Sequence, residues 1–143
     1  MVDVKVKRLT STATIPTKGS EGAAAFDLYA DDSIAIWGNS TVKIPTNIAI
    51  QIPEGYFGGI YARSGLAMNS GLRPATCVSV IDSDFRGNVI VPLHNDTEHV
   101  QRVNAGDRVA QLVIQPCPNV KLVQVDELDA ADRGNGGFGS TGV

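Results

Sequence analysis

The chain has 143 residues, of which 43% are hydrophobic, and its formal net charge is −3. That length accommodates one domain with a substantial core, and the negative charge argues against a general nucleic-acid binder, which carries a basic face. No apolar run reaches the roughly 20 residues needed to span a bilayer, and MVDVKVKRLT at the start lacks the apolar region of a signal peptide.

Short runs rich in valine, isoleucine and threonine predict the strands, in chain order. The first is VDVKVKRL (2–9), and the second is STVKIPTNIAIQIPEG (40–55), where Pro45 predicts an edge, a bulge or a break. The apolar residues of that second run fall on alternating positions, as in a half-buried strand. They are Val42, Ile44, Ile48, Ile50 and Ile52. The more uniformly apolar runs NVIVPLHN (88–95) and RVAQLVIQP (108–116) predict central strands. VKLVQVDEL (120–128) predicts a last strand.

Turn residues separate these runs, in PEG, NSG, SDFRGN and NAGD. The best helix candidate is one or two turns at SGLAMNS (64–70), with Ser64 as its cap and Gly71 at its end. Many short strands with regular turns predict an all-β fold, a single-domain distorted jelly-roll-like barrel or sandwich with one short helix. Cys77 and Cys117 form no CxxC pair and have apolar neighbours, so we expect buried thiols in a cytoplasmic protein.

The end of the chain has a different composition. From Ala130 on, little apolar area is present to offset the entropy of ordering, so we expect a β-domain over 1–129 and a flexible segment over 130–143. Its glycines match a dinucleotide fingerprint in spacing, but no helix follows them, which excludes a Rossmann site. Such a segment can wrap a ligand, with Arg133 on phosphate oxygens and Phe138 over a flat ring. A functionless terminus is the alternative.

Two internal stretches carry further chemistry. In YARSGLA, Arg63 and Ser64 precede the short helix, which favours a phosphate site; an ion pair with a surface carboxylate is the alternative. In SVIDSDFRG, Asp82 follows Val80 and Ile81, so we expect it at a buried edge, where a carboxylate is costly unless it is used. It could deprotonate a water molecule or merely cap a turn.

Asp27 in AAAFDLYA is either a hydrogen-bonded buried acid or an outer-sphere metal group, and Gln111 lies within a strand. His94 and His99 lack zinc-site spacing and are interpreted as loop residues. The chain has no Walker A loop, no GxSxG and no Cys/His cluster. The remaining pattern suggests that the ligand is a nucleotide polyphosphate whose charge is neutralised by arginine and Mg²⁺.

Five stretches in this order, from STATIPTKGSEGAAAFDLYA to RGNGGFGSTG, resemble the trimeric dUTPase family. The resemblance implies a homotrimer whose three active sites lie at subunit interfaces, each closed by the tail of one subunit. It implies Mg²⁺-dependent hydrolysis of dUTP to dUMP and pyrophosphate, which keeps uracil out of DNA, without direct contact with nucleic acid or membrane. The setting would be the cytoplasm, or the host-cell cytoplasm if the protein is viral.

The resemblance also implies residue roles. Asp82 matches the general base for attack of water at the α-phosphorus, Asp27 the acid that holds water on Mg²⁺, and the hairpin from Thr76 to Asp82 the uracil slot. The substrate-binding positions are Arg63, Ser64, Gly65, Thr76, Val78, Val80, Ile81, Phe85, Gln111, Arg133, Phe138, Gly139, Ser140 and Thr141. Thr76 stands where many members have asparagine, Ser79 where glycine is usual, and Phe85 where tyrosine is usual.

Three other functions fit the same architecture. A dCTP deaminase would be expected to use a glutamate near the base, where SVIDSDF has only aspartates. A regulatory protein that binds a partner would need no turnover. A capsid subunit would leave Asp82 and the tail unexplained.

Overall fold

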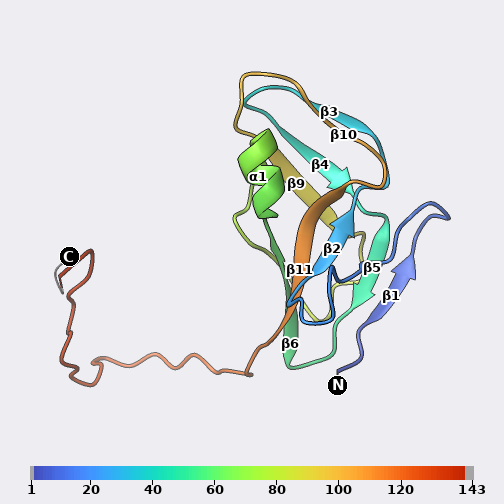
Figure 1. Cartoon of the computed structure of the whole chain (residues 1–143). Coiled ribbons are helices and arrows are strands. Elements are labelled where there is room, and N and C mark those ends of the chain that lie inside the picture. The colour runs from blue at the N-terminus through green and yellow to red at the C-terminus, as the bar shows by residue number, and fades with distance from the viewer. Residues whose placement is uncertain (1, 141–143) are drawn as a thin grey trace.

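The computed structural model describes residues 2–140, which form short antiparallel strands and one short helix (Figure 1). No helix within that range is long and apolar enough to cross a membrane. In chain order the elements are β1 (Lys5–Arg8), β2 (Phe26–Tyr29), β3 (Ile34–Ile36), β4 (Thr41–Pro45), β5 (Ile48–Gln51), β6 (Tyr56–Tyr61), α1 (Ser64–Ser70), β7 (Leu72–Pro74), β8 (Ser79–Ile81), β9 (Ile90–Asn95), β10 (Gln101–Val103) and β11 (Arg108–Pro116).

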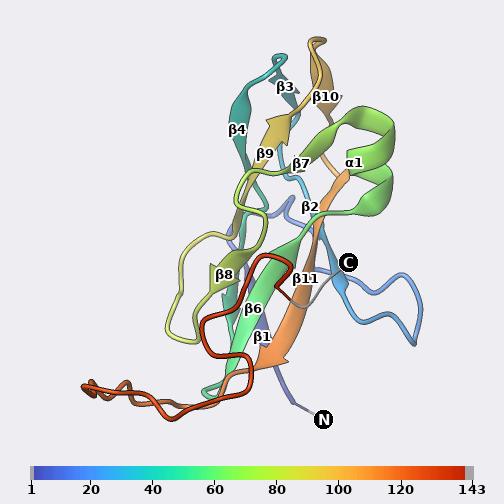
Figure 2. The ribbon, with the colours of Figure 1, turned by 90° about the vertical axis from the view of Figure 1, so that its left-hand side faces the viewer.

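The strands form a four-stranded sheet in the order β2-β11-β6-β8, a three-stranded sheet in the order β4-β9-β7, and the pairs β1-β5 and β10-β3. Every pairing is antiparallel. The apolar sides meet in one core, whose largest fully buried side chains include Leu28, Ile36, Ile44, Ile48, Ile60 and Leu93. Figures 1 and 2 show α1 at one end of this body, beside β9 and β7. The all-β prediction with one short helix is confirmed.

The break predicted at Pro45 is present. Pro45 ends β4, and Asn47, with a φ of 50°, turns the chain before β5 begins at Ile48. Side chains of the predicted apolar parity still enter the core on both sides of the break, because Ile44 and Ile48 are both fully buried. β9 and β11 are central strands, as predicted.

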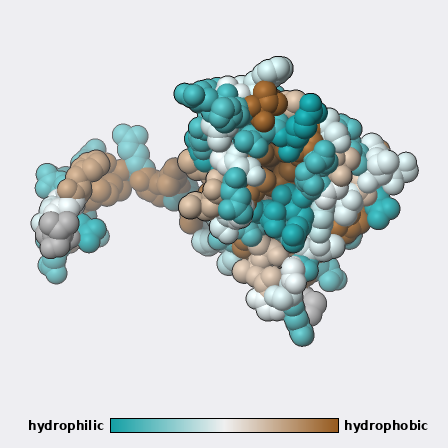
Figure 3. Space-filling view, turned by 45° about the horizontal axis from the view of Figure 1, so that its top comes forward, coloured by the Kyte–Doolittle hydropathy of each residue, from teal (hydrophilic) through white to brown (hydrophobic). Residues whose placement is uncertain are grey.

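The strand predicted over 120–128 is wrong for the isolated chain. After β11 ends at Pro116, the described residues up to 140 contain no strand, and Figure 1 shows them leading away from the body. Val120, Leu122 and Val125 are 72%, 94% and 55% exposed, and Figure 3 shows apolar surface along this segment. Alternating apolar and polar side chains are typical of a strand, but a strand also needs a neighbouring strand to which its backbone can hydrogen-bond. This segment has no such neighbour within the described part of its own chain.

Two local expectations also need correction. Both cysteines are free, as expected, but they are exposed: Cys77 lies in the turn before β8 and Cys117 directly follows β11, so neither side chain reaches the core. The helix cap is shifted by one residue, because Arg63 occupies the N-cap position without a side-chain bond and Ser64 is already helical. Gly71 does end α1, in the left-handed conformation with a φ of 64°.

Gly71→Ala should lower the free energy of unfolding by about 1–2 kcal/mol, because a left-handed conformation is costly for a residue with a Cβ. That Cβ would also lie 2.5 Å from the Thr97 methyl carbon. Urea unfolding at a fixed protein concentration measures the loss. Gly22→Ala is the control, because its Cβ would meet nothing within 4 Å. Equal midpoints for the two variants would contradict the account of this helix end.

Candidate active site

Asp27, Arg63, Arg108 and Gln111 come together at one end of the central sheet; we call them the arginine cluster. The register pairs Gln111 of β11 with both Asp27 of β2 and Tyr61 of β6. Arg63 Nε lies 3.1 Å from Asp27 Oδ1, and Arg108 Nη1 lies 3.3 Å from Asp27 Oδ2. Gln111 Nε2 donates to the Ala62 carbonyl oxygen at 2.7 Å. Strand pairing therefore assembles groups that are far apart in the sequence.

The cluster places two guanidinium groups on one carboxylate, which leaves a formal charge of +1. Asp27 is the most buried of the three charged side chains, at 14% exposed, against 25% for Arg63 and 51% for Arg108. Each arginine carries five N–H donors in a planar fork, so donors remain available for oxyanions. Of the two alternatives open for Asp27 from the sequence, the structure shows a largely buried, hydrogen-bonded acid.

Arg108 is a member that sequence reasoning did not select. In the sequence it follows Asp107 at the start of a strand, and such an acid–base pair is a common surface pattern. Its main chain also contributes, because Arg63 Nη1 donates to the Arg108 carbonyl oxygen at 3.0 Å. The available signal was its position three residues before Gln111 on the same strand.

A hollow of about 650 Å³ lies beside the arginine cluster. Asp27, Gln111 and Tyr61 line it, together with the small side chains of Ala23–Ala25 and the exposed Cys77. Ser64 and Gly65 follow Arg63 as the first residues of α1, and both are exposed. Amide and hydroxyl groups line the hollow, and Arg63 and Arg108 contact Asp27 at its edge, so a phosphate-bearing ligand there would lie near positive charge.

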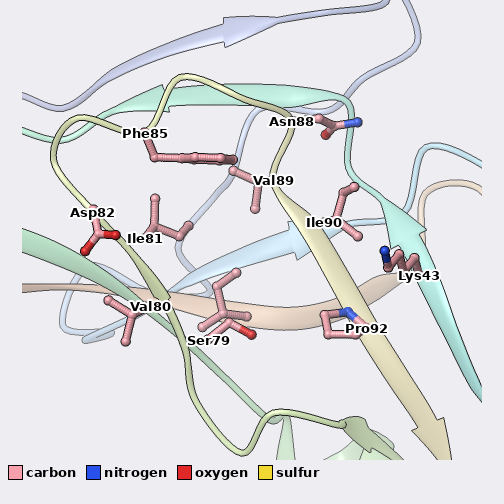
Figure 4. A pocket seen from close by; sticks show the side chains of 11 residues that line it. Lys43, Ser79, Val80, Ile81, Asp82, Phe85, Asn88, Val89, Ile90 and Pro92 are labelled. Carbon is pink, nitrogen blue, oxygen red and sulfur yellow. The ribbon is translucent and has the colours of Figure 1, made fainter.

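A second hollow, of about 360 Å³, lies between β8 and β9, and we call it the hairpin cleft. Figure 4 shows Asp82 and Phe85 at one side of it, with Ile90, Pro92 and Lys43 at the other. Phe85 is 42% exposed, and its ring lies so close to Gly87 that a Cβ there would meet Cζ at 2.7 Å. Glycine at position 87 therefore lets the aromatic ring lie flat along the loop.

Asp82 itself is exposed, so the expectation of a carboxylate at a buried edge is wrong for the single chain. β8 is an edge strand of the central sheet, and successive side chains of a strand point to opposite faces. Ile81 is turned into the core at 5% exposed, and the next residue, Asp82, therefore points outward. Val80, on the same outward side, is 61% exposed.

The loop that carries Asp82 and Phe85 is anchored by a chain of amides. Asn88 Nδ2 donates to Asn47 Oδ1 at 2.7 Å, and Asn47 Nδ2 donates to Asp31 Oδ2 at 2.8 Å. The Asn47 hydrogen bond, followed by that of Thr10, holds the pKa of Asp31 below its usual value. A charged acceptor thus fixes the direction of both amides and ties the loop to the turn after β4.

The arginine cluster and the hairpin cleft lie at opposite ends of β6. Ile81 pairs with Gly58, and Arg63 follows Gly58 by five residues. At about 3.3 Å per residue along a strand, Asp82 and Arg63 are about 16 Å or more apart. One chain therefore does not bring the predicted base and the predicted phosphate ligands together.

The remaining predicted positions fall into two groups. Thr76 and Val78 are exposed in the turn before β8. Arg133, Phe138, Gly139 and Ser140 lie in the segment after β11, where Phe138 is fully exposed, and Thr141 lies outside the described residues. Figure 1 shows this segment leading away from the strands that carry Asp82 and the arginine cluster. Between residues 2 and 140, no three His, Cys, Asp or Glu side chains form a metal-binding group.

These features define a class: a single-domain jelly-roll-like β-protein with a cationic site for a phosphate-bearing ligand. The sequence model of the dUTPase family matches residues 11–142, so the chain belongs to the dUTPase family. It is 39% identical over 143 residues to the deoxyuridine 5′-triphosphate nucleotidohydrolase of Paramecium bursaria Chlorella virus 1, covering 100% of both chains.

Solved structures give the same answer for the fold. A mutant of the dUTPase of Staphylococcus bacteriophage 80alpha with dUpNHpp superposes with a TM-score of 0.93 at 27% identity, covering 99% of both chains. A mutant of the dUTPase from phage phi11 of S. aureus, whose structure describes the coordination of a structural Mg(II) ion, superposes with a TM-score of 0.80. That match is 24% identical and covers 87% of this chain and 97% of that one, so it shows the fold alone.

Arg63→Gln should weaken the binding of inorganic triphosphate by about 10- to 150-fold, because a hydrogen bond to a charged group contributes about 1.5–3 kcal/mol. Isothermal titration calorimetry measures the affinity. Arg73→Gln is the matched control, because Arg73 is held by Asp96, at 2.7 Å, and not by the arginine cluster. Equal affinities for both variants would show that the cluster does not bind the anion.

Proposed function

We propose that the protein hydrolyses dUTP to dUMP and pyrophosphate. The observation that carries this proposal is the arginine cluster beside an open hollow, in a chain that belongs to the dUTPase family. The bacteriophage 80alpha dUTPase, which shares the fold, holds the substrate analogue dUpNHpp. The enzyme is a dUTP diphosphatase. By hydrolysing dUTP it lowers the amount of dUTP that can be incorporated into DNA.

We propose that the active site forms between chains of a homotrimer. This follows from the separation along β6, since Asp82 must come from one subunit and the arginine cluster from another. The apolar segment from Val120 to Leu128 supports it, because its exposed side chains need a partner surface that the chain does not supply. On this proposal residues 1–129 are the β-domain and residues 130–143 close a neighbour's site.

In the proposed mechanism, Asp82 accepts a proton from water, and the oxygen of that water attacks the α-phosphorus. The bond from the α-phosphorus to the oxygen bridging it to the β-phosphorus breaks, so dUMP and pyrophosphate form. Arg63, Ser64, Gly65 and Gln111 donate to phosphate oxygens and place the chain of phosphates in line with the water. Asp82 is exposed, so its carboxylate oxygens are open to a water molecule from which they can accept a proton.

Mg²⁺ fits this site through Asp27. The carboxylate already accepts from two guanidinium groups, so it suits a water-mediated contact rather than a cage of protein ligands. Mg²⁺ commonly keeps its waters and binds one carboxylate together with substrate phosphates. When bound, the ion supplies neutralisation of the triphosphate charge.

We propose that the hairpin from Thr76 to Asp82 holds uracil, with Val78, Val80 and Ile81 along it, and that Phe85 packs on the deoxyribose. Arg133, Phe138, Gly139, Ser140 and Thr141 of another subunit cover the bound nucleotide, with Phe138 over the base. Its complete exposure in the single chain agrees with a residue that packs only after assembly and binding. We place this activity in the cytoplasm, or in the host cytoplasm for a viral protein.

A dCTP deaminase is the second candidate, for one reason. A third hollow, of about 690 Å³, is lined by both Glu54 and Asp82. A glutamate therefore does lie near the hairpin. Ammonia release from dCTP by the purified protein would favour the deaminase, and pyrophosphate release from dUTP without ammonia release would reject it.

Asp82→Asn should reduce kcat by about 10²–10⁴-fold while dUTP still binds, because the amide cannot accept the proton of water. A pyrophosphate-release assay measures turnover, and calorimetry measures binding. Asp84→Asn, an exposed carboxylate two residues away, should retain activity. Near-normal turnover by Asp82→Asn would mean that another group activates the water.

Removal of residues 133–143 should eliminate most of the activity without dissociating the trimer, because the segment touches substrate and not the body of its own chain. Activity assays with size-exclusion chromatography and light scattering measure both effects. A truncated trimer with unchanged kcat and KM would show that the segment does not cover the site.

A further inference from the structure

Two hydroxyl groups meet in the turn that leads into β8. Thr76 Oγ1 and Ser79 Oγ form a hydrogen bond in which either oxygen can be the donor. Thr76 is exposed, and Ser79 begins β8 opposite Ile60. Figure 4 shows the Ser79 side chain inside the hairpin cleft, on the side of Pro92. Ser79 therefore lines the cleft that also contains Asp82 and Phe85, and Thr76 is hydrogen-bonded to it.

Hydrogen-bond capacity distinguishes this pair from hydroxyls that donate to a carboxylate. Each hydroxyl has one O–H donor and two acceptor positions. When one hydroxyl donates to the other, the accepting hydroxyl still has its own O–H to donate to a ligand. The donating oxygen still has lone pairs that can accept a hydrogen bond from a ligand. Reversing the internal bond exchanges the two. Thr10 and Thr12 cannot do this, because both donate to the Asp31 carboxylate and their polarity is fixed.

The two natural pyrimidine bases differ in the polarity of the same two atoms. Uracil offers an N3–H donor beside an O4 acceptor, whereas cytosine offers an N3 acceptor beside an N4–H donor. A group of fixed polarity matches one of these edges and leaves an unpaired donor or acceptor against the other. A pair of hydroxyls that reverses its internal bond matches both.

We propose that Thr76 and Ser79 act as one unit that binds the 3,4-edge of a pyrimidine in either polarity. They add affinity for deoxyuridine and deoxycytidine nucleotides alike, and any preference for dUTP comes from the backbone of the hairpin. This inference rests on the proposed function, which places the base against residues 76–82. The hairpin cleft, at about 360 Å³, is within the usual range of about 300–1,000 Å³ for small-molecule sites.

The simpler account is that the bond only closes the turn, where Cys77 has a φ of 56°. Closing the turn would not require the hydroxyls to face a cleft. It also predicts a different result, because a purely structural bond affects unfolding and not the affinity for a base. Among the hydrogen bonds of residues 2–140, neither hydroxyl has a second protein partner, so both retain capacity for a ligand.

The test compares Thr76→Val, Ser79→Ala and the double variant, all as full-length protein. Calorimetry measures the affinity for dUpNHpp and for its deoxycytidine counterpart. Each single variant should weaken both ligands by about five- to tenfold, which corresponds to one lost hydrogen bond. The double variant should be within about twofold of either single variant, because the pair acts as a unit. Ser83→Ala, a hydroxyl on the same loop outside the pair, should change neither affinity.

The preference for uracil over cytosine, as a ratio of affinities, should stay within about threefold of the wild-type value in all three variants. A change in this ratio of about tenfold or more in Ser79→Ala would show fixed polarity and overturn the inference. Unchanged affinities in both single variants of an active enzyme would overturn it too, and leave the bond as a turn closure. Failure of the wild-type protein to release pyrophosphate from dUTP would instead overturn the proposed function.

Discussion

The proposed active site depends on the distance between Arg63 and Asp82, which lie near opposite ends of β6. β6 holds the arginine cluster at one end and, through its pairing with β8, the carboxylate of Asp82 near the other. A strand is rigid on this scale, so no loop movement within one chain closes a gap of about 16 Å. The chemistry proposed for Asp82 and Arg63 therefore requires a second copy, and this requirement also explains why so much of the chemistry-bearing surface is exposed.

The electrostatic state of Asp27 belongs to the same argument. In the absence of a ligand, the Asp27 carboxylate contacts both Arg63 and Arg108. Its negative charge offsets the repulsion between the two guanidinium groups. On the proposed function, a triphosphate brings a larger negative charge and takes over the guanidinium donors, which leaves Asp27 available to a hydrated cation. The cluster is thus preorganised for an anion while it remains stable without one.

Sequence patterns predicted the parts of the fold that depend on one chain. The period of two in residues 42–52, the break at Pro45 and the end of α1 at Gly71 all follow from local chemistry, and the structure confirms each. Expectations failed where burial depends on tertiary or quaternary neighbours. Val120–Leu128 has the alternation of a strand without a partner, and Asp82 and both cysteines are exposed although apolar residues precede or surround them in the sequence. Arg108 was not selected because only strand pairing brings it to Asp27.

The most direct test of a shared site uses two impaired variants, Asp82→Asn and Arg63→Gln, unfolded together in equal amounts, refolded as mixed trimers and assayed at a dUTP concentration too low to saturate Arg63→Gln. If each site takes Asp82 from one subunit and Arg63 from another, random assembly restores both intact groups in about a quarter of the sites. Pyrophosphate release should then reach about a quarter of the wild-type rate. Mixed trimers that stay at the activity of the separately refolded parents would contradict the account, because each site would then be contained within one chain.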